Sequence, residues 1–162
     1  MMTVYHGGTD IVSQPICAFG RQNLDFGQGF YVTDLREQAV NWALTIAQRR
    51  KAEPLINAYS FDRQGYLGEA KALVFPAYNR DWLNFIVDSR KGLHPWKDYD
   101  YVEGGIANDR VIDTINLYME GLMDVDVALK RLAMHSPNNQ ICLLNQVLTD
   151  KYLIYNETQP AR

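Results

Sequence analysis

Glycines border two short strand-like segments near the N-terminus, and this arrangement limits what the chain can fold into. Residues 3–6 read as a strand that runs into the sequence His-Gly-Gly at residues 6–8. Residues 29–33 read as a second strand, rich in β-prone Phe, Tyr, Val and Thr and entered through two glycines. Because glycine has no side chain, the backbone beside it can approach a ligand closely. The pattern predicts two strands whose ends leave room for a bound molecule.

The rest of the chain alternates between helices and strands and reads as one domain, residues 1–162. Asp34 is expected to cap a helix, with Glu37 completing a capping box. Gly65 and Gly68 are expected in turns that follow a strand. The expected helices are 34–49, 81–91, 108–120 and one that starts at Asp124; the further expected strands are 55–61, 99–102, 140–144 and 152–155. Strands at both ends, with helices concentrated between them, indicate an α+β fold.

The composition is that of an ordinary globular protein. Of the 162 residues, 47% are apolar and 22% are charged, and the net charge of −3 gives no general electrostatic reason to bind nucleic acid. The apolar runs are far shorter than the roughly 20 residues that span a bilayer, and no secretory signal is visible. Cys17 and Cys142 are interpreted as buried reduced thiols, too few for a metal site. We therefore expect a cytoplasmic protein without membrane contact or bound metal.

The histidine and glycine that end the first strand are candidates for ligand contact. The ring of His6 can donate a hydrogen bond, and the N–H and C=O of Gly7 suit a carboxamide, which offers both a donor and an acceptor. The alternative is a strand that ends in a turn, with His6 bonded only to the protein. Taken alone, the motif favours that alternative.

Two aromatic residues and one arginine extend this candidate site. Tyr31 on the second strand and Trp42 on the following helix could sandwich a flat cationic ring, with roughly 0.5–2 kcal/mol from each contact. The alternative is that both are core aromatics, which is their commoner fate. Arg21, between Gly20 and Gln22, could meet a phosphate as a forked donor or could form a salt bridge within its loop.

Together these residues resemble the ADP-ribosyltransferase superfamily, in its His-Tyr-Glu branch shared by diphtheria toxin and the poly(ADP-ribose) polymerases. The resemblance implies split mixed and antiparallel sheets around an NAD cleft, with several helices. It implies that His6 and Gly7 bind the nicotinamide ribose and carboxamide. It also implies that Tyr31, which follows Gly29 in a Gly-x-Tyr strand, stacks on the nicotinamide, and that Trp42 replaces the usual second tyrosine. The whole length also resembles a family of small uncharacterised bacterial domains assigned to this superfamily, through residues 5–7, 25–31, 38–43, 107–109 and 140–142.

The chain departs from the superfamily at the third catalytic position. The superfamily has a glutamate at the start of a late strand, and this sequence has Gln140 there. An anion about 4 Å from the developing cation is worth at most about 4 kcal/mol, or on the order of a thousandfold in rate. Glu103 and Asp109 are possible sources of the missing charge. Asn138 matches a position that helps to orient the acceptor.

The function implied by the resemblance is NAD-dependent mono-ADP-ribosyl transfer. NAD is the co-substrate, its nicotinamide–ribose bond is cleaved, and ADP-ribose passes to a protein or nucleic-acid acceptor. A toxin or defence effector, with a cognate antitoxin or regulator, is compatible with so small a domain. A catalytically weak or inactive NAD-binding module and an NAD glycohydrolase remain the alternatives.

Overall fold

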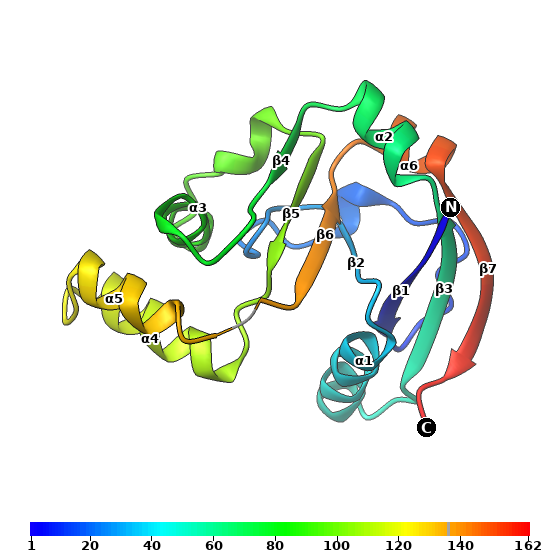
Figure 1. Ribbon diagram of the computed structural model, residues 1–162. Helices are drawn as coiled ribbons and strands as arrows, with labels where there is room; N and C mark the ends of the chain where they lie inside the picture. The colour runs from blue at the N-terminus through cyan, green and yellow to red at the C-terminus, as the bar shows by residue number, and fades with distance from the viewer. Residues whose placement is uncertain (136) are drawn as a thin grey trace.

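The computed structural model describes residues 1–135 and 137–162 of the protein, with Asp109 described by its backbone alone. Among these residues, seven strands form two sheets that stand side by side in Figure 1. The first sheet is antiparallel, with the order β1 (Met2–Gly8), β3 (Leu55–Phe61) and β7 (Leu153–Pro160). The second is mixed, with the order β2 (Phe30–Val32), β6 (Asn139–Leu143), β5 (Tyr101–Gly105) and β4 (Ala72–Val74), of which β4 and β5 are parallel.

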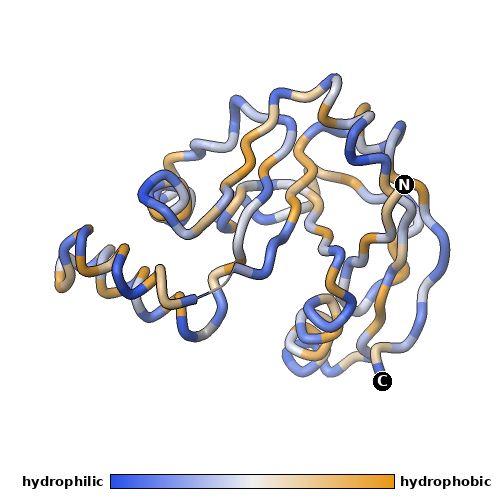
Figure 2. Tube along the Cα trace, in the orientation of Figure 1, coloured by the Kyte–Doolittle hydropathy of each residue, from blue (hydrophilic) through white to orange (hydrophobic). Residues whose placement is uncertain are grey.

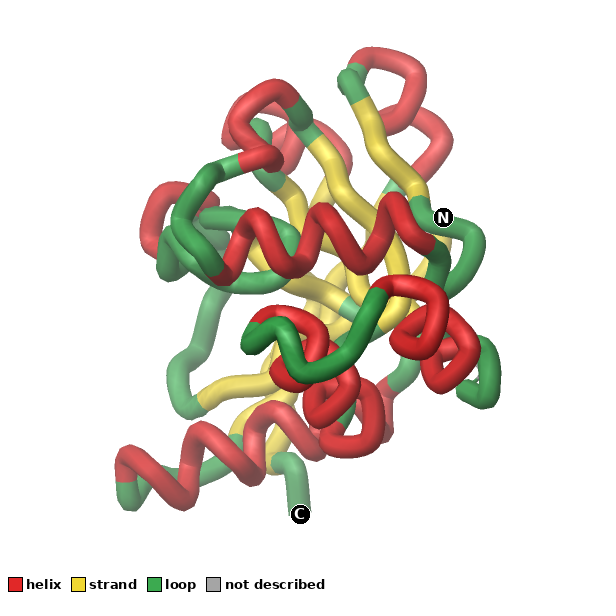
Figure 3. The backbone as a smooth tube through the Cα atoms, turned by 90° about the vertical axis from the view of Figure 1, so that its left-hand side faces the viewer, coloured by secondary structure: helices red, strands yellow, loops and turns green. Residues whose placement is uncertain are grey.

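The helices pack around these sheets. They are α1 (Arg36–Arg50), α2 (Arg63–Glu69), α3 (Arg80–Arg90), α4 (Asp109–Met119), α5 (Val125–Leu132) and α6 (Gln146–Tyr152), with short 3₁₀ turns at Cys17–Phe19 and Pro95–Asp98. Figure 3 shows the helical side of the molecule, where α3, α4 and α5 lie in front of the second sheet. The expected α+β class, with one antiparallel and one mixed sheet, is confirmed. Among the described residues, no helix has the length and hydrophobicity to cross a membrane.

A single backbone bridge joins the two sheets. The N–H of Tyr5 on β1 donates to the carbonyl of Thr33 at 2.7 Å, and the N–H of Thr33 returns the bond at 3.0 Å. One apolar cluster lies between the sheets and includes Phe30 and Tyr59, whereas a second packs α3, α4 and α5 against the far face of the second sheet. The outer strand β7 is mainly hydrophilic in Figure 2. The bridge between Tyr5 and Thr33 is here called the junction of the two sheets.

Two of the expected local features are wrong. The cap of α1 is Leu35 rather than Asp34, and the hydroxyl of Thr33 accepts from the N–H of Leu35 at 3.1 Å. Gly65 and Gly68 lie inside α2 and not in turns. A Cβ on Gly65 would come within 2.5 Å of the Tyr152 ring. The first turn of α1 is thus organised by Thr33 rather than Asp34, whereas α2 begins at a local cap, in which the Asp62 carboxylate accepts from the N–H of Gly65 at 3.0 Å.

Candidate functional site

His6 on β1 forms a hydrogen bond to β2 of the other sheet, next to the junction of the two sheets. Its Nδ1 lies 2.7 Å from the carbonyl oxygen of Tyr31, and its ring stacks on Phe30 with centroids 4.4 Å apart. Because a carbonyl only accepts, Nδ1 carries the proton in this bond. Burial lowers the pKa of His6, so the ring is neutral and its Nε2 is a hydrogen-bond acceptor. Both His6 and Tyr31 line one cavity, which has a volume of about 600 Å³.

The backbone of Gly7 is oriented by the ladder of β1. Since the N–H and C=O of Tyr5 bond to Thr33 on the β2 side, alternation directs those of Gly7 to the same side, away from β3. A Cβ on Gly7 would lie 1.9 Å from the carbonyl oxygen of Ala39 on α1. The glycine is therefore required by contact with α1, while its backbone donor and acceptor face the junction of the sheets.

Tyr31 is held by its hydroxyl group. The hydroxyl donates to the carbonyl of Gly27 at 2.7 Å and accepts from the N–H of Phe26 at 3.1 Å. Burial raises the pKa of Tyr31 well above its ordinary value, so the phenol stays protonated. Gly29 lines the same cavity, but a Cβ there would meet the Cys142 sulfur at 2.6 Å. Packing against β6 thus accounts for this glycine.

The expected site residues divide between two cavities. His6, Arg21, Gly29 and Tyr31 line the cavity of about 600 Å³, here called the histidine cavity. Trp42, Asn138 and Gln140 line a second cavity of about 1170 Å³, here called the glutamine cavity.

Helix α1 connects the two cavities. Gln38, Trp42 and Thr45 line the glutamine cavity, while Ile46 and Arg49 line the histidine cavity. Gln38, Trp42 and Thr45 are three or four residues apart, and so are Trp42, Ile46 and Arg49, so the two linings follow adjoining positions along the helix. The cavities are therefore neighbours along one side of α1.

Gln140 is buried at the start of β6, beside the first turn of α1. The carbonyl of the preceding Asn139 accepts from the Gln38 amide at 3.1 Å and from the Thr33 hydroxyl at 3.3 Å. Asn138 is exposed, and its carbonyl accepts from the N–H of Ile106 at 2.9 Å. These bonds fix the backbone that carries Gln140 against α1.

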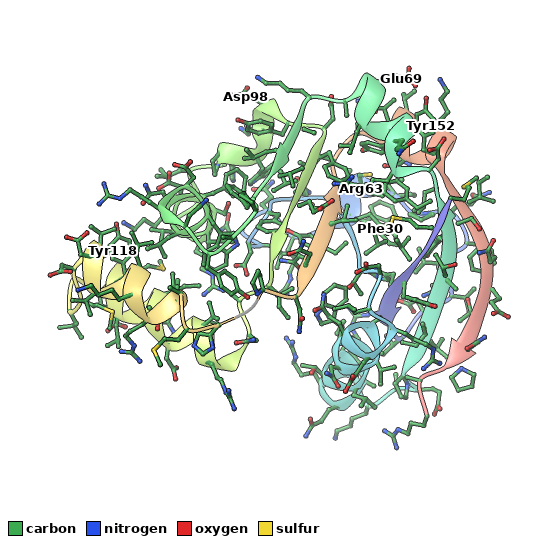
Figure 4. The ribbon with its side chains drawn as sticks, viewed as in Figure 1. Phe30, Arg63, Glu69, Asp98, Tyr118 and Tyr152 are labelled. Atoms are coloured by element: carbon green, nitrogen blue, oxygen red, sulfur yellow. The ribbon has the colours of Figure 1, made fainter. Side chains whose placement is uncertain are left out.

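Glu103 does not supply the charge that Gln140 lacks. On β5 it pairs with Ile141, one position along from Gln140, so the two side chains point to opposite faces of the sheet. Its carboxylate accepts from Arg63 at 2.9 and 3.2 Å and from the Tyr101 hydroxyl. In Figure 4, Arg63 and Phe30 lie in the region between the two sheets. The side chain of Asp109, the other candidate, lies outside the described residues.

Sequence reasoning missed residues on the same face of α1. Gln38 is buried, and its Oε1 has no hydrogen-bond partner among the described residues. Arg49, in the last turn of α1, lines the histidine cavity. The signal was available, because both residues lie at helical spacing from Trp42.

Comparison with known proteins gives one match, which covers nearly the whole chain. The model of the family described as "Protein of unknown function (DUF3990)" matches residues 2–155. Neither the curated proteins nor the solved structures contain a match. Since the matched segment includes both sheets except the end of β7, the chain belongs to the DUF3990 family.

Proposed function

We propose that the protein binds NAD⁺ along α1 and transfers its ADP-ribose to a macromolecule. The observation that carries this proposal is the hydrogen bond of 2.7 Å between His6 Nδ1 and the Tyr31 carbonyl. It joins two residues from different sheets that the superfamily resemblance also brings together. It also leaves Nε2 of a neutral imidazole as an acceptor for a ribose hydroxyl.

In this proposal each cavity holds a different part of the dinucleotide. The nicotinamide ring lies between Tyr31 and Trp42, and its carboxamide bonds to the backbone of Gly7. The diphosphate lies toward Arg21 and Arg49 in the histidine cavity, where forked guanidinium donors match phosphate oxygens. In this placement the anionic diphosphate lies beside the arginines of the histidine cavity, and the cationic nicotinamide ring lies beside the acids of the glutamine cavity.

The reaction begins when the bond between nicotinamide and the ribose anomeric carbon breaks. Its electron pair stays on the nicotinamide nitrogen, so the leaving group is neutral and needs no general acid. The ribose carries developing positive charge, as in glycoside cleavage. Gln140 holds a ribose hydroxyl by a hydrogen bond, and the fixed geometry positions the anomeric carbon for the acceptor.

The glutamine cavity is large enough for a transfer reaction. Its volume of about 1170 Å³ leaves room for an acceptor group beside the expected position of the ring. An NAD-binding module without activity is the second candidate. It is favoured by the neutral Gln140 and by the position of Glu103 on the opposite face, in a pair with Arg63. A toxin or defence role stays a prediction.

The test is incubation of the protein with NAD⁺ and a bacterial lysate, with separate labels on nicotinamide and adenine. A transferase releases nicotinamide and leaves adenine label on macromolecules. A hydrolase releases nicotinamide and leaves only soluble label, whereas a binding module releases none. His135→Asn, outside both cavities, is the control for His6→Asn. Equal nicotinamide release by the two variants would remove His6 from the site.

A further inference from the structure

The glutamine cavity has an acidic wall at the start of α1, formed by Asp34, two residues before the helix, and by Glu37 in its first turn. Asp34 and Glu37 line this wall and are exposed, and neither forms an ion pair among the described residues. On another side of the cavity, Asp25 is neutralised by Arg90 at 2.8 Å. Arg36, the cation in this lining, donates to Gln159 at 3.4 Å. Asp34 and Glu37 contribute −1 each and Arg36, whose Gln159 partner is neutral, contributes +1, so the net charge of the wall is −1.

An unpaired oxygen lies in the same wall. Gln38 is only 6% exposed, and its amide nitrogen is fixed by bonds of 3.1 Å to the Thr33 hydroxyl and the Asn139 carbonyl. The Asn139 carbonyl can only accept a hydrogen bond, so the side-chain atom of Gln38 that faces it must be the amide nitrogen and the other atom must be Oε1. Oε1 itself has no partner among the described residues. A buried acceptor without a donor is unfavourable, so this cavity suits a ligand that brings donors.

We propose that the glutamine cavity receives the guanidinium group of an arginine side chain on an acceptor protein. The inference rests on the proposed function and names the class of its acceptor. A guanidinium is positive and carries five N–H donors in a plane. It can pair with the exposed carboxylates of Asp34 and Glu37, and a shift of the buried Gln38 side chain would let it reach Oε1 as well. Nucleic acid is disfavoured, because its phosphates would approach a negative wall.

The transfer of ADP-ribose to a guanidinium needs only NAD⁺, the arginine side chain and the two acids. A guanidinium nitrogen forms a bond to the ribose anomeric carbon as the bond from that carbon to nicotinamide breaks. Nicotinamide departs neutral with the electron pair of the broken bond. The guanidinium nitrogen loses one proton, which Asp34 or Glu37 accepts and passes to solvent. No oxidant, reductant or metal is required.

The same acids have a competing structural role. Carboxylates near the N-terminus of a helix interact favourably with its dipole, which would account for Glu37 in the first turn and Asp34 just before it without a ligand. The two roles differ in what they affect. A structural role changes thermal stability alone, whereas an acceptor site changes the binding of a guanidinium.

The first experiment measures binding to the full chain without NAD⁺. Nα-acetyl-arginine methylamide is titrated and followed by NMR, with the lysine analogue as the matched ligand. We expect the arginine analogue to bind more tightly, and its Kd to rise about fivefold in Glu37→Gln and about tenfold in Asp34→Asn/Glu37→Gln. Glu53→Gln, an exposed acid after α1 and outside the cavity, should leave the Kd unchanged. Equal Kd values for all variants, or for both ligands, would overturn the inference.

The second experiment separates this inference from the proposed function. NAD⁺ labelled on adenine is incubated with the protein and the arginine analogue, the lysine analogue or a single-stranded DNA oligonucleotide. Label on the arginine analogue, reduced in the double variant while NAD⁺ affinity is kept, supports the inference. Label on the oligonucleotide or the lysine analogue overturns it and leaves the proposed function standing. Absence of NAD⁺ binding, with the arginine analogue still bound, overturns the proposed function and leaves the cavity as a guanidinium site.

Discussion

At the scale of single residues, packing explains two glycines of the expected site, Gly7 and Gly29, and their neighbour Gly27. An added Cβ would clash with the Ala39 carbonyl at Gly7, with the Cys142 sulfur at Gly29 and with the Trp96 ring at Gly27. Gly27 also has a positive φ of 104°. The sequence pattern suggests uncovered backbone for a ligand, and only at Gly7 does the ladder also direct a backbone donor and acceptor toward the site. A glycine beside a candidate site therefore needs its packing partner identified before it is assigned to binding.

Gly7→Ala and Gly8→Ala form a matched pair that tests this packing. A Cβ on Gly7 would lie 1.9 Å from a backbone carbonyl of α1, whereas one on Gly8 would meet only His6 Nε2, at 3.8 Å. We expect Gly7→Ala to lower the free energy of unfolding by about 1–3 kcal/mol or more. Gly8→Ala should change it by less than about 1 kcal/mol. Urea unfolding of both variants measures the difference, and similar losses would contradict the contact with α1.

The pH dependence of stability tests the state of His6. Its ordinary pKa is 6.5, and burial lowers the pKa in the folded protein. Below pH 6.5 His6 becomes protonated in the unfolded chain but stays neutral in the folded protein. The free energy of unfolding therefore decreases as the pH falls from 6.5 toward the pKa of the folded state. His6→Asn can keep a donor to Tyr31 without titrating. We expect a smaller loss between about pH 7.5 and pH 5.5 in this variant than in the wild type; equal losses would mean that His6 titrates normally.

At the scale of elements, what the sequence predicts depends on how local the cause is. Helices α3, α4 and α5 begin at Asn79, Asn108 and Asp124, whose side chains cap their own helices, and periodicity with local caps predicts such helices well. Helix α1 differs, because its first turn is organised by Thr33 and Asn139, which are 106 residues apart. No local motif encodes that contact.

Thr33→Val and Asp34→Ala test how α1 begins. Thr33 is fully buried, and its hydroxyl accepts from Leu35 and Gln38 and donates to Asn139. Thr33→Val should lower the free energy of unfolding by about 1–3 kcal/mol, because it leaves these groups without partners. Asp34→Ala should cost at most about 1 kcal/mol, the contribution of a charge near the helix dipole. A larger cost for Asp34→Ala would restore the capping box.

At the scale of the whole molecule, the site depends on how the two sheets meet. The superfamily resemblance predicts that His6 and Tyr31 belong to one site, and in the structure His6 Nδ1 lies 2.7 Å from the carbonyl oxygen of Tyr31. It does not predict that Trp42 and Gln140 line a separate cavity, because that division follows from where α1 crosses the junction of the sheets. Contacts between distant segments place Tyr31 and Trp42 in different cavities, so no local pattern contains this division.

Trp42 provides the test of whether one ligand spans both cavities. Trp42 is half-buried on α1 and lines the glutamine cavity, whereas Trp82 is fully buried in the core and the half-buried Trp96 lines neither cavity. A ligand that reaches the glutamine cavity should therefore quench the fluorescence of Trp42 and leave that of Trp82 and Trp96 unchanged. Trp42→Ala should weaken NAD⁺ binding about 2- to 30-fold, because a stacking contact of roughly 0.5–2 kcal/mol is lost. Trp42→Phe keeps an aromatic face, so it should retain most of the affinity while losing the fluorescence change. If NAD⁺ binds equally well to Trp42→Ala, the ligand lies in the histidine cavity alone and the ring is not held against α1.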